Sequence, residues 1–392
     1  GGGDWNPYSW YVDYTDDIYI GYKYYETAYA EKEKDLAGSG EEWYEENVQF
    51  PFGYGLSYSD FEWTVNPVTP AGSVLDGDGK IEIEVTVKNN GPEKGKDVVQ
   101  LYYTAPYTPG EVEKAHVVLG DFVKTDELAV GESKTYPLSV DVRDMASYDY
   151  ANKNGNEYTG YELDAGTYTV GIMKNSHEAE ATFDYSIIED IYYGYSDVNE
   201  EQKVENLFDD VSGYIDEYLS RENAFENYEC LKGADSAENR EVTDEFIKSW
   251  TYVLNDSESD PWYAATAPIQ SKKELSYNKT EVKLHDLIGK RYDDPLWNTL
   301  LDQLTIDQMI PVISTGNYRT LQIENIGKPL TIDADGPMGF ASFMGDDAVS
   351  DTYYYASEAV LGATWNVKLA YEFGVMIGDE SLVGDLGGDG RT

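Results

Sequence analysis

Apolar and polar residues alternate along the stretch IEIEVTVKN, residues 81–89. A period of two is typical of a β-strand with one face in a core and the other face in water. The apolar positions that share one face are Ile81, Ile83, Val85 and Val87. Similar short stretches follow, DVVQLYYTAP, KTYPLSVDV, GTYTVGIMK and ATFDYSI, with turn-forming clusters such as NNGPEKGK between them. Several short strands separated by turns predict an antiparallel β-sandwich, which we place at residues 64–190.

The pattern changes to a helical period after this region. Over residues 197–221 apolar residues fall on one helical face and acidic residues on the other, which predicts a helix packed against an apolar partner. The stretch PLWNTLLDQL predicts another helix, and Thr305 with Gln308 has the pattern of a capping box for the next one. A short strand at Leu330–Ile332 and a closing helix over residues 366–380 follow. Helix, strand, loop and helix in this order are typical of the beginning of an α/β barrel.

The region before the sandwich, residues 1–63, is poorer in regular pattern. We interpret DIYIGYKYYE, Asp17–Glu26, as a strand. The segment FPFGYGLSYSDF, Phe50–Phe61, concentrates aromatic rings with glycine and proline. The region alone is too small to form a domain. The opening GGGDWNPYSWYVDY has no basic segment followed by an apolar one, so we read it as a chain entered midway rather than as a signal peptide.

Composition restricts the partners. The chain has 28 lysines and arginines and 75 aspartates and glutamates, which gives a formal net charge of -47. Nucleic acid and anionic membrane surfaces are therefore unfavourable partners, because they are negatively charged as well. No run of 18 apolar residues occurs, so we expect no membrane span. The 36 tyrosines and 8 tryptophans suit stacking on sugar rings, although filling sandwich and barrel cores is the commoner use of aromatic residues. The single cysteine, Cys230, excludes an internal disulfide.

We expect neither a metal nor a cofactor. The three histidines, His116, His177 and His285, lie far apart in the sequence without ligand spacing, and we expect them to be solvated loop or strand residues. The acidic composition is compatible with a secreted or a cytoplasmic protein, and with a homo-oligomer.

The stretch DADGPMG is the strongest candidate for binding chemistry. Asp333 and Asp335 follow the predicted strand, and ligands bind at that end of the strands in an α/β barrel. A carboxylate can accept hydrogen bonds from two adjacent hydroxyls, which suits a sugar. On local sequence alone the simpler interpretation is that Asp335 starts an Asp-Gly-Pro turn.

Two groups of motifs resemble glycoside hydrolase family 3. The first group is similar to the C-terminal region of that family, where an α/β-sandwich domain ends and a fibronectin type III-like domain follows. It comprises PFGYGLSY, VTVKNNG, DVVQLYYTAPYTPGEVEK and GTYTVGI. The resemblance implies that the rings of Phe50–Phe61 fill a junction between these two domains. The second group is similar to the start of the family's (β/α)₈ barrel. It comprises YDDPLWNTLLDQLTIDQM, IENIGKPLTIDADGPMGF and ATWNVKLAYEFGVMIGDES. The order is inverted, as in a β-glucosidase subgroup of the family.

The resemblance implies a multidomain fold, α/β plus all-β, in which only parts of two domains are present. We expect the end of the α/β-sandwich domain at residues 1–63 and a fibronectin type III-like β-sandwich at residues 64–190. A helical or irregular linker at residues 191–285 and the first part of the (β/α)₈ barrel at residues 286–392 complete the arrangement.

The implied function is part of a retaining glycoside hydrolase that cleaves β-glucosides or related β-glycosides from the non-reducing end. In the family the nucleophilic aspartate and the acid/base glutamate lie at positions outside this sequence, so we expect no catalytic residue here and no activity from the chain alone. Asp335 matches the family's aspartate that binds sugar hydroxyls, although Ala341 stands where many members have arginine. The partner expected is a β-glucoside or oligosaccharide substrate. The alternatives are a non-catalytic carbohydrate-binding or surface interaction module, and a purely structural role.

Overall fold

A computed structural model divides the chain into two compact units, residues 1–247 and residues 248–392. The residues described are 14–35, 39–195, 203–206, 218–226, 282–315, 319–332, 336, 338–340 and 353–383.

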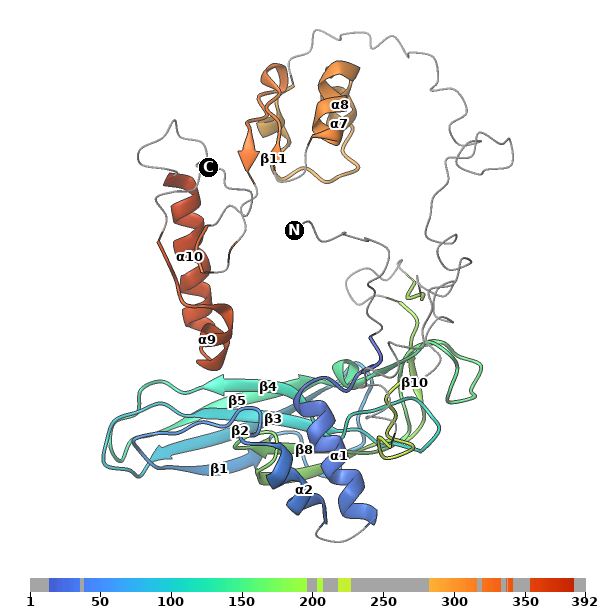
Figure 1. Ribbon diagram of the computed structural model, residues 1–392, viewed down its shortest axis with the longest axis vertical. Helices are drawn as coiled ribbons and strands as arrows, with labels where there is room; N and C mark the ends of the chain where they lie inside the picture. The colour runs from blue at the N-terminus through green and yellow to red at the C-terminus, as the bar shows by residue number, and fades with distance from the viewer. Residues whose placement is uncertain are drawn as a thin grey trace, which may run out of the picture. The chain divides into compact units, whose positions relative to one another are not determined.

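The first unit is built around a β-sandwich (Figure 1). One sheet has the strand order β1-β2-β5, the facing sheet has the order β4-β3-β8-β9, and a small third sheet has the order β10-β7-β6. All these pairings are antiparallel. The strands are β1 (Phe61–Pro67), β2 (Lys80–Asn89), β3 (Val98–Thr104), β4 (Val118–Lys124), β5 (Ser133–Asp141), β6 (Ser147–Asp149), β7 (Gly160–Leu163), β8 (Gly166–Met173), β9 (Ala179–Ile187) and β10 (Ile191–Tyr193), with a 3₁₀ turn η1 (Val142–Met145) after β5. The antiparallel sandwich predicted from the alternating pattern is confirmed.

The core of the sandwich lies between the two larger sheets. The four apolar residues of β2 on one face are completely buried, and they alternate with exposed or half-exposed residues along the strand. They pack in one cluster with residues from the opposite sheet, among them Leu101, Val170 and Ile172. The period of two therefore identified both the strand and its buried face.

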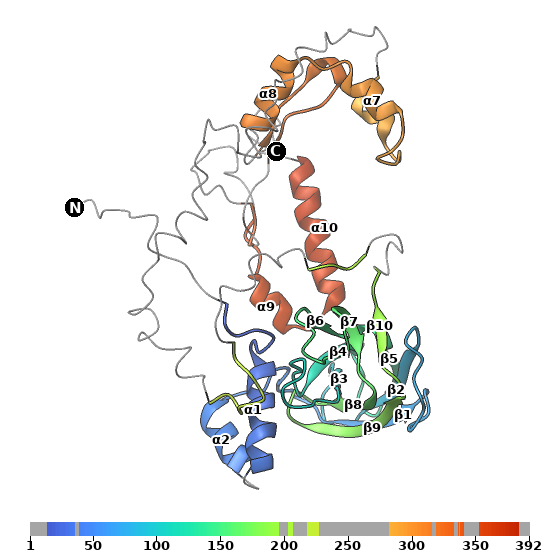
Figure 2. The same ribbon diagram turned by 90° about the vertical axis from the view of Figure 1, so that its right-hand side faces the viewer.

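Two helices precede the sandwich and pack against it. They are α1 (Tyr22–Asp35) and α2 (Ser39–Asn47), and Figure 2 shows them side by side next to the strands. The Tyr22 ring of α1 packs edge-on against Tyr102 of β3, with a centroid distance of 6.1 Å. The helix pair thus belongs to the same compact unit as the sandwich.

The prediction of a strand at Asp17–Glu26 is wrong, because the chain turns at residues 15–18 and α1 begins at Tyr22. Gly21 has a φ of 59° and directly precedes the helix. The buried face of α1 contains Glu26, Thr27 and Ala28 rather than large apolar residues. A buried face that is polar and small leaves no helical hydrophobic pattern in the sequence.

The aromatic segment around Phe52 is attached to the sandwich mainly through its backbone. Phe52 O accepts from Ser176 N at 2.8 Å, and Gly53 O accepts from Gln100 Nε2 at 3.2 Å. The Phe52 ring stacks on Tyr22 with a centroid distance of 4.5 Å. Phe61 at the end of the segment packs against the sandwich core, whereas Phe52 is 41% exposed despite its stacking contact. The expectation that the rings fill a junction is therefore not met by most of the segment in the described structure. Four other large side chains are also exposed. They are Phe50 at 60%, Tyr54 at 44%, Leu56 at 89% and Tyr58 at 94% exposure.

Replacing Gly53 by alanine is expected to destabilise the first unit by about 1–3 kcal/mol. Gly53 has a φ of 84°, and a Cβ there would lie 2.0 Å from Oε1 of Gln100. The buried Gln100 side chain cannot move aside freely, because it also donates to Lys174 O and accepts from Tyr102 OH. Urea unfolding checks the effect. Gly55→Ala is the matched control, since a Cβ at Gly55 meets no atom within 4 Å, and an equal loss in both variants would contradict the argument.

The second unit has a small core formed by short helices and a hairpin. Its elements are η3 (Leu284–Leu287), α7 (Leu296–Leu301), α8 (Ile306–Ser314), β11 (Arg319–Thr320), η4 (Glu324–Ile326), β12 (Thr331–Ile332), α9 (Glu358–Ala363) and α10 (Val367–Val383). The capping box is confirmed, because Thr305 Oγ1 accepts from Gln308 N at 3.1 Å and Gln308 Oε1 accepts from Thr305 N at 2.9 Å. The closing helix is confirmed as α10. The predicted strand appears as β12, paired antiparallel with β11.

The helix expected over residues 197–221 is not formed where the structure describes this stretch. Residues 203–206 are non-helical, and Lys203 forms an isolated bridge with Tyr195. Residues 218–220 are also non-helical, and the remainder of the predicted helix lies outside the described residues. The apolar residue Leu219 is buried against the first unit, which accounts for part of the apolar pattern without a helix.

Candidate functional site

The predicted sugar-binding residue Asp335 lies outside the described residues, as do Asp333 and Ala341. The structure describes the backbone on both sides of this loop. Gly339 has a φ of 122°, and a Cβ there would lie 2.2 Å from Tyr353 O. Met338 O accepts from Tyr355 N at 2.7 Å. Met338 and Gly339 therefore lie close to the segment that precedes α9, and the role of Asp335 stays a prediction.

The first unit contains two buried polar networks that join segments far apart in the sequence. The first is centred on Glu26 of α1, whose side chain is 2% exposed. Its Oε1 accepts from Tyr44 OH at 2.6 Å and from Ser176 Oγ at 2.7 Å. Its Oε2 lies 2.9 Å from Nδ1 of His177, in the turn between β8 and β9. One carboxylate thus fastens both helices to the sandwich.

The ring of His177 is enclosed by the helix pair. It stacks on Tyr44 with a centroid distance of 3.9 Å and meets Tyr29 edge-on at 4.7 Å. Burial by itself lowers the pKa of His177, but the hydrogen bond and charge of Glu26, together with Glu41, raise the pKa above its ordinary value. A protonated His177 is therefore the better partner for this buried carboxylate.

The attachment of the helices is expected to depend on pH. Because the pKa of His177 is raised on folding, its contribution to stability is full below the unfolded value of about 6.5 and is lost as pH rises through the folded pKa. Hydrogen exchange of the α1 amides should therefore become faster relative to that of β2 as pH rises through this range. His177→Gln keeps a donor toward Glu26 without titrating, and should remove the pH dependence of this difference. An unchanged dependence in the variant would contradict the role of His177.

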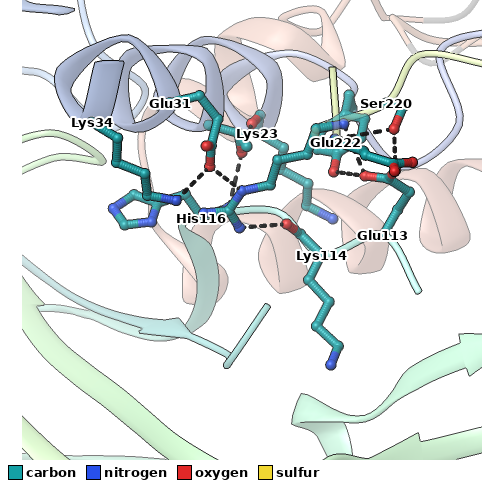
Figure 3. A network of polar contacts seen from close by, with 11 residues as sticks. Lys23, Glu31, Lys34, Glu113, Lys114, His116, Ser220 and Glu222 are labelled. Carbon is teal, nitrogen blue, oxygen red and sulfur yellow. Dashed lines mark hydrogen bonds and ion pairs between the residues drawn. The ribbon is translucent and has the colours of Figure 1, made fainter. Parts of the chain in front are cut away.

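The second network is centred on Arg221, which is 5% exposed (Figure 3). Its Nε donates to Glu31 of α1, and its Nη1 donates to Lys114 O at 2.9 Å. Its guanidinium lies over the Tyr107 ring, 4.4 Å from the centroid. Burial by itself raises the pKa of Glu31, but hydrogen bonds from Lys34 and Arg221 lower it below its ordinary value. The network therefore holds an ionised carboxylate against a buried cation.

Glu113 extends this network on the side of Ser220. Its Oε2 accepts from Arg221 N at 3.0 Å and from Tyr19 OH. Its Oε1 accepts from Ser220 Oγ at 2.5 Å. Figure 3 shows Glu31, Lys114 and Glu113 around the same group of contacts. Segments near residues 19, 31, 113 and 220 are thereby held together.

His116 lies beside this network and was expected to be solvated, which is wrong. Its backbone N donates to Thr27 Oγ1 at 2.9 Å, while its Nδ1 is buried and has no hydrogen-bond partner among the described residues. Burial, reinforced by the positive charges of Arg221 and Lys34, lowers the pKa of His116 to about 4. The same expectation is wrong for the half-buried His177. It is confirmed for His285, whose side chain is 70% exposed.

Both networks hold distant segments of the chain together, and neither was predicted from the sequence. Glu26 lies in a tyrosine-rich stretch that resembled a strand, and its partner His177 is 151 residues away. Arg221 lies at the end of a stretch that resembled a helix. Among the described residues no group of three or more His, Cys, Asp or Glu side chains could hold a metal ion. In the same part of the chain no helix combines the length and apolarity needed to cross a bilayer.

Both units of the chain match known proteins in sequence. The model of the fibronectin type III-like domain matches residues 97–176. The chain is 29% identical over 389 residues to β-glucosidase A of Butyrivibrio fibrisolvens, a match that covers 95% of this chain and 42% of that protein. It is 32% identical over 251 residues to a β-glucosidase of Ruminococcus albus, which covers 60% of this chain and 24% of that protein.

A solved structure adds evidence on the fold. The β-glucosidase from Paenibacillus barengoltzii is similar with a TM-score of 0.59 and 24% identity, over 94% of this chain and 36% of that one. The chain thus spans less than half the length of these relatives. The domain match falls within the β-sandwich, and the Butyrivibrio match extends through both units. The chain is thus similar in sequence to β-glucosidases over nearly all of its length.

Proposed function

We propose that this chain is part of a retaining glycoside hydrolase that removes β-glucosides or related β-glycosides from the non-reducing end of its substrate. The observation that carries the proposal is the match to a β-glucosidase over 389 residues, since it includes the sandwich and the segment around Asp335 in one alignment. A retaining enzyme needs a carboxylate nucleophile and a second carboxyl group about 5 Å away. We assign both groups to sequence beyond this chain, so the chain alone is inactive.

The proposed arrangement is the end of an α/β-sandwich domain, a fibronectin type III-like domain, a linker and the first part of a (β/α)₈ barrel. In it Asp335 follows β12, where its carboxylate accepts hydrogen bonds from sugar hydroxyls. Two features of the described residues support such a loop. Glycines with positive φ lie at 336 and 339, and the chain passes close to Tyr353. Sharp backbone turns of this kind let a short side chain reach a ligand.

Hydrolysis of an aryl β-glucoside tests the proposal. The chain alone should be inactive, whereas the same chain extended at both ends with its natural flanking sequence should be active. In the extended protein, Asp335→Ala should lower kcat/KM by about 10- to 100-fold, the loss expected when a hydrogen bond to a charged group is removed. Asp293→Ala is the control, because the Asp293 side chain is 75% exposed and should tolerate the change.

Two outcomes would count against the proposal. Activity of the chain alone that Asp335→Ala abolishes would mean that the catalytic groups are within these residues. An extended protein that binds a β-glucoside in calorimetry but never hydrolyses it would instead identify the alternative, a non-catalytic carbohydrate-binding module.

A further inference from the structure

Residues 218–226 form a short segment whose two apolar side chains are buried in the first unit. Leu219 is 2% exposed and Phe225 is 5% exposed. They belong to a cluster with Tyr19, Ala28 and Ala115, which come from the turn before α1, from α1 itself and from the segment before β4. The Phe225 ring meets Tyr19 edge-on, with a centroid distance of 4.7 Å. The segment is thus anchored at both ends by apolar contacts.

A charged contact lies between these two anchors. Two carboxylates, Glu31 and Glu113, face the segment. The segment supplies Arg221 to Glu31 and two donors, Ser220 Oγ and Arg221 N, to Glu113. Lys114 O accepts from the guanidinium at 2.9 Å. Carboxylates beside an arginine are complementary in charge, and a planar guanidinium can contact a carboxylate, a carbonyl and an aromatic face together.

The backbone of the segment adopts uncommon angles where it contacts the first unit. Ala224 and Phe225 have φ values of 51° and 61°, a region that residues with a Cβ adopt rarely. Leu219 N donates to Thr15 O at 2.9 Å, and Phe225 N donates to Ser220 O at 3.1 Å. Uncommon backbone angles persist where surrounding contacts hold them. The contacts of the segment with the sandwich unit are mostly made by side chains, without a continuous sheet pairing.

We propose that α1 and residues 111–118 form a peptide-binding groove for the motif Leu-Ser-Arg-Glu-Asn-Ala-Phe, whose occupant is the chain's own residues 219–225. The bound segment is a latch. It can open without unfolding of the sandwich, because no sandwich strand pairs with it in the described part of the chain. This inference does not depend on the proposed enzymatic function.

Hydrogen exchange of the full chain tests the latch. Arg221→Met keeps an unbranched apolar stem and removes the guanidinium, so exchange across residues 218–226 should become at least tenfold faster while β2 and β8 keep their protection. Arg143→Met is the matched control, since Arg143 also lies over a tyrosine ring, 4.7 Å from the centroid of Tyr193, but outside the groove. Glu222→Ala changes an exposed residue of the segment itself and should leave its protection unchanged.

A peptide added in trans completes the test. A synthetic peptide of residues 217–227 should bind the Arg221→Met chain in calorimetry, and the same peptide carrying Arg221→Met should bind at least tenfold more weakly. Three results would overturn the proposal: unchanged exchange in Arg221→Met, loss of protection in β2 together with residues 218–226, or equal binding of the two peptides. If Arg221→Met fails to fold, Arg221→Lys retains the charge, and faster exchange confined to residues 218–226 would still identify the latch.

Discussion

Ile83→Ala is expected to lower the free energy of unfolding of the sandwich by about 2–5 kcal/mol. Ile83 is completely buried at the centre of β2, where it lies opposite Pro67 of β1 and Leu138 of β5. Truncation removes three buried carbon atoms and leaves a cavity between sheets that are fixed by hydrogen bonds on both sides of the strand. Because the neighbouring strands cannot close that space completely, the cost includes a cavity term as well as lost apolar burial.

Hydrogen exchange of the β2 and β5 amides during urea unfolding measures this domain separately from the second unit. Glu84→Ala is the control on the same strand, because Glu84 faces solvent and its truncation should change stability by no more than about 0.5 kcal/mol. If Ile83→Ala cost no more than Glu84→Ala, the assignment of the two faces of β2 would be wrong.

The faces of β2 could be predicted because strand period and burial are both local properties. The same holds for the capping box of Thr305 and Gln308, which requires only residues three apart. In each case the interaction that decides the structure lies within one turn or one strand of the residue concerned. Much of the sandwich and the ends of several helices could therefore be predicted from the sequence.

Contacts between distant segments could not be predicted in this way. Tyrosines alternate with other residues before Glu26, which suggested a strand, but the segment becomes a helix because its polar side chains find buried partners elsewhere. The partner of Glu26 is His177, and the partners of Arg221 lie more than 100 residues before it. A charged residue with a distant buried partner looks, in sequence, like any solvated one. The local pattern singled out Asp335 but favoured a turn there, and the family resemblance made it a predicted sugar-binding residue.

His116 should make the sandwich unit sensitive to acid. Its pKa is lowered on folding from 6.5 to about 4, so between these values the unfolded chain binds more protons than the folded chain. Stability therefore falls as pH decreases from 6.5 toward 4. Since one pKa unit corresponds to about 1.4 kcal/mol, the loss attributable to His116 approaches roughly 3 kcal/mol near pH 4.

His116→Phe should remove this loss, because phenylalanine fills a similar volume and has no ring nitrogen to protonate. Urea unfolding of the sandwich at pH 7, 6, 5 and 4 should show the variant gaining stability relative to the wild type as pH falls. His177→Gln is the informative comparison, since the pKa of His177 is raised on folding and its loss should have the opposite pH dependence. A constant difference between His116→Phe and wild type at all four pH values would show that His116 is not held neutral in the fold. The two histidines thus act in opposite directions, because His177 has a buried carboxylate as its partner, whereas His116 is buried without a partner for its Nδ1 among the described residues and lies near the positive charges of Arg221 and Lys34.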